Sequence, residues 1–583
     1  MLKKIFFLAL VLFLTKTRSQ NVTNDLQTIF EATDGKETAT YNQVVAYYQM
    51  LAERFEEIKV TQKGLTDSEE PLMLVTFTPK AVAVNKEQEE KPLTVLINNG
   101  IHPGEPDGID ATMMLFRDLA TGKLPALQHT VVATIPVYNI GGALNRNSHS
   151  RTNQNGPEAY GFRGNARNYD LNRDFIKSDT RNASAFAGIY HELEPDIFID
   201  NHVSNGADYQ YTLTHLFTQH NKLGGQAGDF LHKQLRPELE NKLLDAQWDI
   251  TPYVNVFNSV PEKGFSQFFD SPRYSTGYTT LWNTLGMMVE THMLKPYKPR
   301  VEGTYQLMVS MLEIAETNYK TIRTVRRERL KELYVATTYP LTWENDTTAQ
   351  RSLLFKGYEA DIIKSEVTGL DRLKYDRSRP FEKEVAYRDQ FKPVKAVTIP
   401  EAYLIPVGWH QVITLLRENA IEMELIENDT VLEVEAYRIA DYKTRSSAYE
   451  GHYQHYNTRV ETTTPMVTLR AGMYYRVPTR QKGIRYLLET LEPEATDSFF
   501  NWNFFDTILQ QKEGFSPYVW EDKAKALLES NSELAKAFRL KREQDPEFAT
   551  NWYAQLDWLH KRSENYEKAH LNYPVYRIMK QRP

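Results

Sequence analysis

The chain has 583 residues, too many for one ordinary domain, so two or three domains are expected. Hydrophobic residues make up 41% of it, which is enough to build packed cores and excludes disorder of the whole chain. Its 69 basic and 76 acidic residues give a net charge of -7 and form no basic stripe, which argues against a nucleic-acid-binding protein. Cysteine is absent, so disulfides, thiolate metal sites and lipidated cysteine anchors are excluded, and any metal must be bound by His, Asp or Glu.

The first residues, MLKKIFFLALVLFLTKTRSQ, are typical of a secretory signal peptide. Two lysines precede an apolar run from Ile5 to Leu14, and Thr17 and Ser19 are small residues at plausible cleavage positions. The run is too short to span a bilayer, and no later stretch approaches about 18 apolar residues. We therefore expect residues 1–19 to be a signal peptide and the chain to be secreted or periplasmic, without a membrane span.

From about residue 20 to 340, short apolar runs alternate with amphipathic segments, a pattern typical of an α/β sheet domain. The expected strands are PLMLVTFTP (71–79), PLTVLINN (92–99), TVVATIPVYN (130–139), DIFIDNH (196–202) and GMMVETHM (286–293). The expected helices cover residues 106–121, 179–194, 222–243 and 301–334.

After Pro340 the pattern changes to a mixed α+β region. Residues 341–400 are polar and strand-like, and residues 401–480 predict a strand, a helix and two strands, so 341–480 is expected to be a β-rich or α/β accessory domain. Residues 481–583 are predicted to be mostly helical and are rich in aromatic residues. Those aromatics could line a carbohydrate or peptide surface, but such spacing more often reflects core packing.

The stretch NNGIHPGEPDG (98–108) places His102 and Glu105 three residues apart at the end of an apolar strand. Such a pair alone is weak evidence, because a chain with 14 His and 76 acidic residues contains others by chance. His191 and Glu194 have the same spacing within a predicted helix, and we interpret them as a surface helix end. His102 differs because its strand is apolar on both faces, and ligands bind beyond the carboxyl ends of such strands.

Other polar residues occupy the same kind of position. His202 ends the predicted strand PDIFIDNH, and Glu290 ends the apolar run LGMMVE. Two imidazoles, one carboxylate and an open position form a known catalytic zinc site, so His102, Glu105 and His202 are the predicted ligands. Glu290 is the candidate for proton transfer, because an ionised group at the end of a buried run needs a reason. Asp170 could orient a ligand imidazole.

Four motifs in chain order resemble the zinc carboxypeptidase family of carboxypeptidase A-like metallopeptidases. They are HPGE (102–105), DLNRDF (170–175), DNH (200–202) and VETH (289–292), and the resemblance covers about residues 20–335. It implies an α/β fold in which a mixed, twisted sheet carries helices on both faces. Chains of this layout, with a long C-terminal extension, resemble secreted bacterial members of the family.

The resemblance also assigns roles to single residues. In this family the H-x-x-E pair and the later histidine bind one zinc ion, which implies His102, Glu105 and His202 as ligands. The glutamate after the last sheet strand is the general acid/base, which implies Glu290. The aspartate two residues before the Asn-Arg pair bonds the first zinc histidine, which supports Asp170.

Substrate binding in the family depends on the Asn-Arg pair, which grips the free carboxylate of the substrate and corresponds to Asn172 and Arg173. A guanidinium matches a carboxylate through two parallel hydrogen bonds. Digestive members often carry arginine before the zinc glutamate, whereas this chain has Gly104. Their specificity is therefore not transferred to this chain.

Two further parts of the family pattern have several candidates. For the arginine that polarises the scissile carbonyl we favour Arg151, with Arg167 next, and the other candidates are Arg146 and Arg163. For the mobile tyrosine before the catalytic glutamate we favour Tyr278 over Tyr274. Arg273 is a possible addition to the anion pocket.

The resemblance implies a secreted zinc metallocarboxypeptidase that acts on peptides with a free C-terminal carboxylate. The first alternative is a cell-wall peptide amidase or an amino-acid deacylase on the same scaffold. The second is a non-catalytic binding protein whose aromatic C-terminal part is the working surface. Retention of both Asn172 and Arg173 favours the carboxypeptidase, and the intact ligand set with Glu290 weighs against a binding protein. The oligomeric state is left open.

Overall fold

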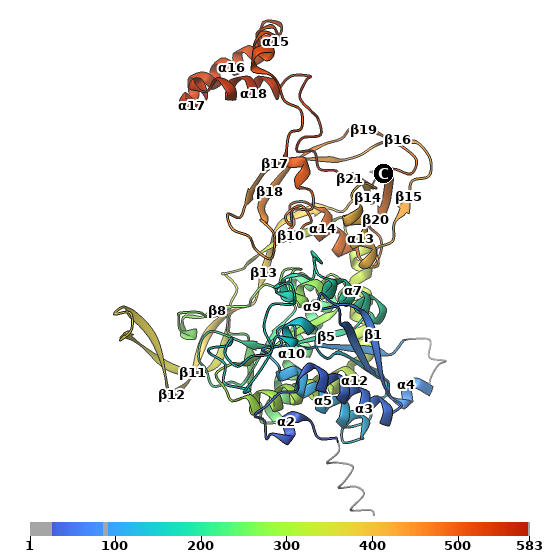
Figure 1. Cartoon of the computed structure of the whole chain (residues 1–583), viewed down its shortest axis with the longest axis vertical. Helices are drawn as coiled ribbons and strands as arrows, with labels where there is room; N and C mark the ends of the chain where they lie inside the picture. Colours follow the sequence, from blue (N-terminus) through green and yellow to red (C-terminus); the bar gives the residue numbers. More distant parts are fainter. Residues whose placement is uncertain (1–25, 85–90, 581–583) are drawn as a thin grey trace, which may run out of the picture.

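A mixed eight-stranded sheet forms the centre of the larger body in the computed structural model, which describes residues 26–84 and 91–580 (Figure 1). The sheet order is β1 (Ile58–Leu65), β2 (Pro71–Phe77), β4 (Thr130–Ile135), β3 (Leu93–Asn98), β5 (Ile197–Ser204), β9 (Leu285–His292), β6 (Leu213–Phe217) and β7 (Ile250–Pro252). The strands β4, β3, β5 and β9 are parallel, whereas the pairs β1–β2, β2–β4 and β9–β6 are antiparallel. The predicted strands and the mixed sheet are confirmed.

Helices cover both faces of this sheet because its central strands are apolar on both sides. On β3, Val95 and Ile97 pack into one core, and Leu96 between them packs into another. The first core includes α3 (Tyr41–Arg54), α5 (Asp107–Ala120) and α12 (Tyr297–Val335), and the second includes α7 (Arg181–Leu193) and α11 (Ser275–Thr280). The expected helix pattern of residues 20–340 is thereby confirmed, with one exception.

The helix predicted over residues 222–243 is interrupted. It consists of α8 (His220–Leu223), α9 (Gly225–Phe230), a π-helical turn (Leu231–Leu235) and α10 (Arg236–Asp245). Gly224 and Gly225 have φ angles of 71° and 55°, which a continuous right-handed helix cannot accommodate. The break therefore lies where the two glycines stand.

The C-terminal region begins with two long antiparallel pairs. In these, β10 (Thr338–Asn345) pairs with β13 (Phe391–Thr398), and β11 (Arg351–Lys364) pairs with β12 (Asp371–Arg388). The β11–β12 hairpin protrudes from the larger body (Figure 1), and β12 also pairs with β8 (Phe265–Ser266) of that body. Residues 341–400 thus have the strand structure that their sequence predicts.

A smaller sheet-rich body follows. Its main sheet contains β14 (Ala402–Pro406), β15 (Glu424–Leu425), β20 (Tyr474–Pro478) and β21 (Tyr576–Ile578), with α13 (His410–Glu418) and α14 (Ile484–Leu491). Two further pairs are β16 (Thr430–Glu433) with β19 (Met466–Leu469), and β17 (Ala436–Thr444) with β18 (His455–Thr463). Because β21 pairs with β14, residues after 480 return to the sheet formed before it.

Residue 480 therefore does not divide two separate cores. Tyr403, Trp502 and Tyr573 are buried in one cluster, which also contains Phe186 and Tyr278 of the larger body. In the stretch 499–505, the buried aromatics are Phe499, Phe500, Trp502 and Phe505. The core-packing interpretation is confirmed for these four.

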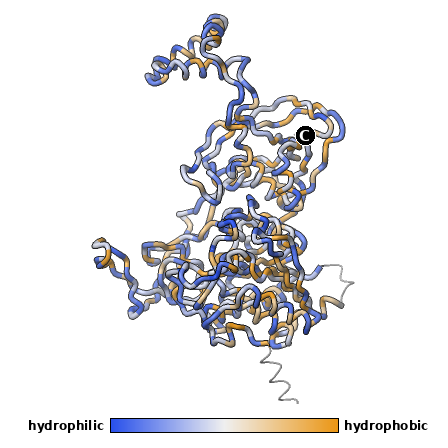
Figure 2. Tube along the Cα trace, viewed as in Figure 1, coloured by the Kyte–Doolittle hydropathy of each residue, from blue (hydrophilic) through white to orange (hydrophobic). Residues whose placement is uncertain are grey.

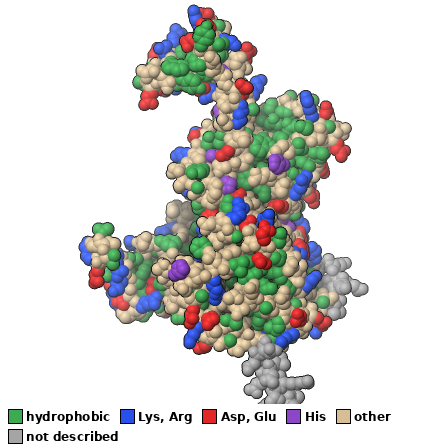
Figure 3. Space-filling model, in the orientation of Figure 1, with side chains coloured by type: hydrophobic (Ala, Val, Ile, Leu, Met, Phe, Trp, Pro, Cys, Tyr) green, Lys and Arg blue, Asp and Glu red, His purple; other side chains and the backbone are tan. Residues whose placement is uncertain are grey.

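A helical head lies farthest from the eight-stranded sheet and consists of α15 (Pro517–Ser530), α16 (Ser532–Gln544), α17 (Pro546–Thr550) and α18 (Trp552–His560) (Figure 1). Hydrophobic and hydrophilic residues alternate along these helices, which bury a small core of their own (Figure 2). Tyr518 and Trp552 are 89% and 62% exposed, and hydrophobic side chains gather on the visible face of the head (Figure 3). Core packing thus does not account for every aromatic residue here.

The predicted signal peptide, residues 1–19, lies outside the described residues. Across residues 26–84 and 91–580, no helix combines the length and the apolar character that crossing a membrane requires. The longest helix, α12, carries charged residues along its length.

Candidate active site

Three adjacent parallel strands bring the predicted site residues to one edge of the sheet. His102 and Glu105 lie in the turn between β3 and α5, His202 lies near the end of β5, and Glu290 lies near the end of β9. His202 and Glu290 are direct register partners on β5 and β9. The carboxyl ends of parallel strands share one sheet edge, which is why residues so far apart in the chain meet.

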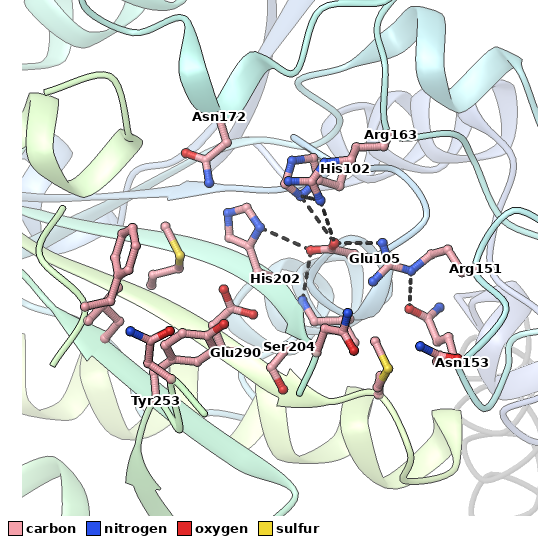
Figure 4. A pocket seen from close by; sticks show the side chains of 18 of the residues that line it. His102, Glu105, Arg151, Asn153, Arg163, Asn172, His202, Ser204, Tyr253 and Glu290 are labelled. Carbon is pink, nitrogen blue, oxygen red and sulfur yellow. Dashed lines mark hydrogen bonds and ion pairs between the residues drawn. The ribbon is translucent and has the colours of Figure 1, made fainter. Parts of the chain in front are cut away.

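His102, Glu105 and His202, called the metal cluster below, point toward one another (Figure 4). Their candidate ligand atoms all lie within 4.8 Å of one another, and all three side chains are buried. Glu105 Oε1 is 3.2 Å from His102 Nδ1, and Glu105 Oε2 is 3.1 Å from His202 Nδ1. The two imidazole rings are 5.1 Å apart, so the predicted convergence is observed.

Each histidine is oriented by a second carboxylate. Asp170 Oδ1 lies 2.9 Å from His102 Nε2, and Asp200 Oδ2 lies 2.8 Å from His202 Nε2. With the Nε2 atoms engaged, the Nδ1 atoms are the ones that face Glu105. Asp170 was predicted and Asp200 was not, although residues two apart on a strand share a face and DNH carried that signal.

Neighbouring charges shift the pKa values of two members of the metal cluster. Burial favours the neutral form of Glu105, but Arg151 and His102 hold the pKa of this carboxyl well below its usual value. Burial disfavours a charged imidazole, yet Asp200 and Glu105 raise the pKa of His202 well above its usual value. Two imidazole nitrogens and a carboxylate, each with a fixed partner, form a donor set that fits Zn²⁺.

Glu290 faces the same cavity beside the metal cluster (Figure 4). Burial raises the pKa of Glu290 to about 8, with Glu105 and Asp200 adding to the shift and His202 opposing it. A carboxyl group of this kind exchanges protons near neutral pH.

Two of the four candidate arginines reach the site. Arg151 Nη1 donates to Glu105 Oε1 at 2.8 Å, and Arg163 donates from Nε and Nη2 to Asp170 Oδ2 at 3.0 and 2.8 Å. Both line the cavity. Arg146 donates instead to the backbone of Thr38, and Arg167 to the backbone of Asp179, so these two are not candidates for contact with a substrate in this cavity.

Arg151 also explains the glycine at position 104. A side chain at Gly104 would meet Arg151 Cδ at 2.6 Å and the carbonyl oxygen of Gly161 at 2.9 Å. The aliphatic part of Arg151 thus occupies the space that a side chain at position 104 needs.

Asn172 and Arg173 line the same cavity as the metal cluster. They belong to a short 3-10 helix (Leu171–Arg173) whose N-cap is Asp170, which accepts the backbone N–H of Asn172 at 2.9 Å. The Arg173 guanidinium lies 4.5 Å from the centre of the Tyr274 ring. The predicted carboxylate-binding pair is therefore held on a capped turn with an aromatic ring against its cation.

The prediction of Tyr278 as the site tyrosine is wrong in position. Its side chain is buried on α11, its hydroxyl donates to Asn419 Oδ1 at 2.6 Å and it lies 3.2 Å from His191 Nε2, away from the cavity. Tyr274, at the N-cap of α11, lines the cavity, and so does Tyr253, which sequence reasoning missed. Tyr274 precedes α11 in extended backbone, whereas Tyr278 lies within the helix, so the two side chains point to different places.

Two other expectations are also corrected. Arg273 is not part of the cavity lining; it pairs with Asp497 of the C-terminal region at 2.6 Å. His191 lies at the end of α7 as expected, but it is half-buried against Trp282, and burial lowers its pKa to about 4.

The cavity has a volume of about 540 Å³, and its lining includes apolar residues as well as the metal cluster. These apolar residues are Val203, Leu216, Phe257, Phe268, Met288 and Met293. The cavity therefore combines polar groups with apolar surface that suits a side chain of a bound molecule.

Comparisons with known proteins agree with this geometry. The chain is 22% identical over 453 residues to carboxypeptidase 2 of Trichophyton rubrum, covering 74% of this chain and 76% of that protein. It is 23% identical over 444 residues to carboxypeptidase 2 of Trichophyton tonsurans, covering 72% and 76%. The chain is therefore similar in sequence to proteins named carboxypeptidase over most of its length. The matched share exceeds residues 20–340, so this similarity includes part of the C-terminal region.

The solved structures that match the chain are more distant in sequence. A metallo-carboxypeptidase from Burkholderia cenocepacia matches with a TM-score of 0.36 and 17% identity, over 48% of this chain and 70% of that one. Carboxypeptidase A from Helicoverpa armigera matches with a TM-score of 0.36 and 14% identity, over 48% and 74%. No protein-family model matches the sequence.

Proposed function

We propose that the chain is a zinc-dependent carboxypeptidase that binds one Zn²⁺ and removes residues from the carboxyl end of peptides. The observation that carries the proposal is that the metal cluster, Glu290 and the pair Asn172 and Arg173 all line one cavity. The relatives named carboxypeptidase support the same activity. Export from the cell is proposed from the sequence of residues 1–19.

Zinc would be held by His102 Nδ1, Glu105 and His202 Nδ1, because the Nε2 atoms of both histidines are bonded to aspartates. When bound, zinc lowers the pKa of a water molecule and polarises the carbonyl that is attacked. Asp170 and Asp200 keep the imidazoles in the orientation and tautomer that metal binding needs.

Arg173 and Asn172 supply the contact that selects a free carboxyl terminus. The guanidinium offers parallel N–H groups to a carboxylate, and the Tyr274 ring restricts its movement. Buried charge-assisted hydrogen bonds of this kind are lost when the substrate ends in a neutral amide. Discrimination between acid and amide is thus expected from this pair.

Glu290 moves the proton. Its carboxylate accepts a proton from the attacking water and delivers it to the amide nitrogen as the C–N bond breaks, which leaves a carboxylate and a free amine. The position of Glu290 beside His202 in register places it next to the metal cluster. Arg151 and Arg163 also line the cavity and are the candidates for contacting the carbonyl oxygen of the scissile bond.

The test uses the purified full chain and two peptides that differ only at the carboxyl terminus. We expect about one zinc per chain, release of the last residue from the free acid, little release from the C-terminal amide, and loss of activity with a chelator that zinc restores. Equal cleavage of both peptides would favour an amidase. Bound metal without hydrolysis of either peptide would favour a binding protein.

A further inference from the structure

A buried ion pair links the C-terminal region to the segment beside the carboxylate-binding pair. Asp497 Oδ1 accepts from Arg273 Nε at 2.9 Å and lies 2.6 Å from its Nη2, and Asp497 Oδ2 accepts from the Arg273 backbone N–H at 3.1 Å. The Arg273 guanidinium also lies 4.8 Å from the Trp502 ring, and the Trp502 indole donates to Asp497. The two charged side chains are 11% and 0% exposed. The backbone N–H and the guanidinium of Arg273 are therefore both bound by residues of the C-terminal region.

The residues that follow Arg273 contact the candidate site directly. Tyr274 packs against the Arg173 guanidinium at 4.5 Å. The Ser275 backbone N–H donates to Asn172 Oδ1 at 3.2 Å, and its hydroxyl donates to Asp200, the carboxylate that orients His202. Arg273 is thus linked to the carboxylate-binding pair through the two residues that follow it.

A second contact comes from the loop between β17 and β18. Glu450 Oε2 accepts the backbone N–H of Asp170 at 2.9 Å. The next residue, Gly451, has a φ of 79°, and a Cβ there would lie 2.8 Å from the Tyr169 hydroxyl. Only glycine allows so close an approach. This loop therefore supports the turn that begins at Asp170 and carries Asn172 and Arg173.

We propose that the C-terminal region is a structural part of the active site, in which Asp497 and Glu450 are positioning residues. Asp497 acts through Arg273 on Tyr274 and Ser275, and Glu450 acts on the backbone of Asp170. The inference rests on the proposed carboxypeptidase function for its kinetic readout. It also has a metal-binding readout that does not depend on turnover.

The first test is Asp497→Asn, which keeps the side-chain shape and removes the charge. We expect the KM for a free-acid peptide to rise about tenfold or more, with kcat within a factor of about three and the zinc content unchanged, because misplacing a substrate-binding group weakens binding. The matched control is Asp506→Asn, which removes another carboxylate of the C-terminal region, 3.0 Å from His455 Nε2, that does not touch residues 273–275. Its KM should equal that of the wild type.

The double variant R273M/D497L separates positioning from stability. Replacing both members of a buried ion pair by apolar residues restores stability in many proteins. We expect a melting temperature near that of the wild type together with a raised KM. A KM that returns to the wild-type value along with the melting temperature would show that the pair is only structural and would overturn the role of Asp497.

The second test is Glu450→Ala. Glu450 lies on a half-buried loop, so we expect this variant to fold. Releasing the Asp170 backbone should weaken zinc binding about tenfold in competition with a chelator, since Asp170 orients a ligand histidine. Unchanged zinc affinity would overturn the role of Glu450. If the wild type cleaves neither peptide, the proposed function fails, and this competition still decides whether the C-terminal region supports the metal cluster.

Discussion

The carboxylate of Glu290 is expected to make the stability of the metal-free protein depend on pH. Burial raises its pKa from 4.5 to about 8, and His202, which opposes that shift, is its register partner. Replacing Glu290 by Gln keeps the shape of the side chain and removes its ionisation. The free energy of unfolding of the metal-free variant should therefore lack one pH-dependent contribution that is present in the wild type.

The sign and size of this contribution to stability follow from the protons bound in the folded and unfolded states. Between pH 4.5 and 8 the unfolded chain releases the Glu290 proton while the folded protein keeps it, so folding loses about 1.4 kcal/mol per pH unit. The full shift corresponds to about 5 kcal/mol, but the carboxylate faces an open cavity, so we expect about 2 kcal/mol. Glu290→Gln should match the wild type near pH 4.5 and exceed its stability by that amount at pH 8.5.

Urea unfolding of metal-free protein, followed by tryptophan fluorescence at several pH values, measures this difference. Zinc should reduce it, because a nearby cation favours the ionised carboxylate. The zinc-loaded variant should retain its metal and lose turnover by about 10³-fold, since the proton carrier is absent. The control is Glu461→Gln at an exposed position on β18. Parallel stability curves for wild type and Glu290→Gln across this pH range would refute the reasoning.

Four further substitutions test the predicted contacts of the site. Arg173→Met should raise the KM for a free-acid peptide about 100-fold and leave slow amide cleavage unchanged, measured with the matched peptide pair. Asp200→Asn should weaken zinc binding about 10- to 100-fold in chelator competition, because it removes the carboxylate on the second ligand histidine. Tyr278→Phe should leave kcat/KM within about twofold, because its hydroxyl contacts Asn419 outside the cavity, whereas Tyr274→Ala should raise KM by loosening Arg173. The reverse order for the two tyrosines would contradict the placement seen here.

The sequence predicted the sheet and the metal cluster well for a physical reason. Central strands such as β3 and β5 are apolar on both faces, so their ends are visible as abrupt changes to polar residues. His102 follows the end of β3 and His202 lies near the end of β5, and parallel strands place their carboxyl ends at one edge. Convergence could therefore be inferred without knowing the order of the strands.

Other parts of the site have no such signal. Arg151 and Arg163 lie in a long irregular segment, where spacing does not tell which side chain turns toward the metal cluster. Tyr274 and Tyr278 differ only in that one precedes α11 and the other lies on its buried face. The contact of Asp497 with Arg273 joins residues 224 positions apart, and no local pattern predicts it.

The contacts of the four acids around the two histidines favour Glu290 as the proposed proton carrier. Glu105 faces both Nδ1 atoms, and Asp170 and Asp200 are each bonded to an Nε2 atom, so all three are committed to the imidazoles. Across the described residues, no hydrogen bond ties the Glu290 carboxylate, which faces the cavity instead. The lowered pKa values of Glu105 and Asp170 make these carboxylates poor bases, whereas the raised pKa of Glu290 allows it both to accept and to return a proton near neutral pH. The division of roles among these acids therefore follows from which of them already has a partner.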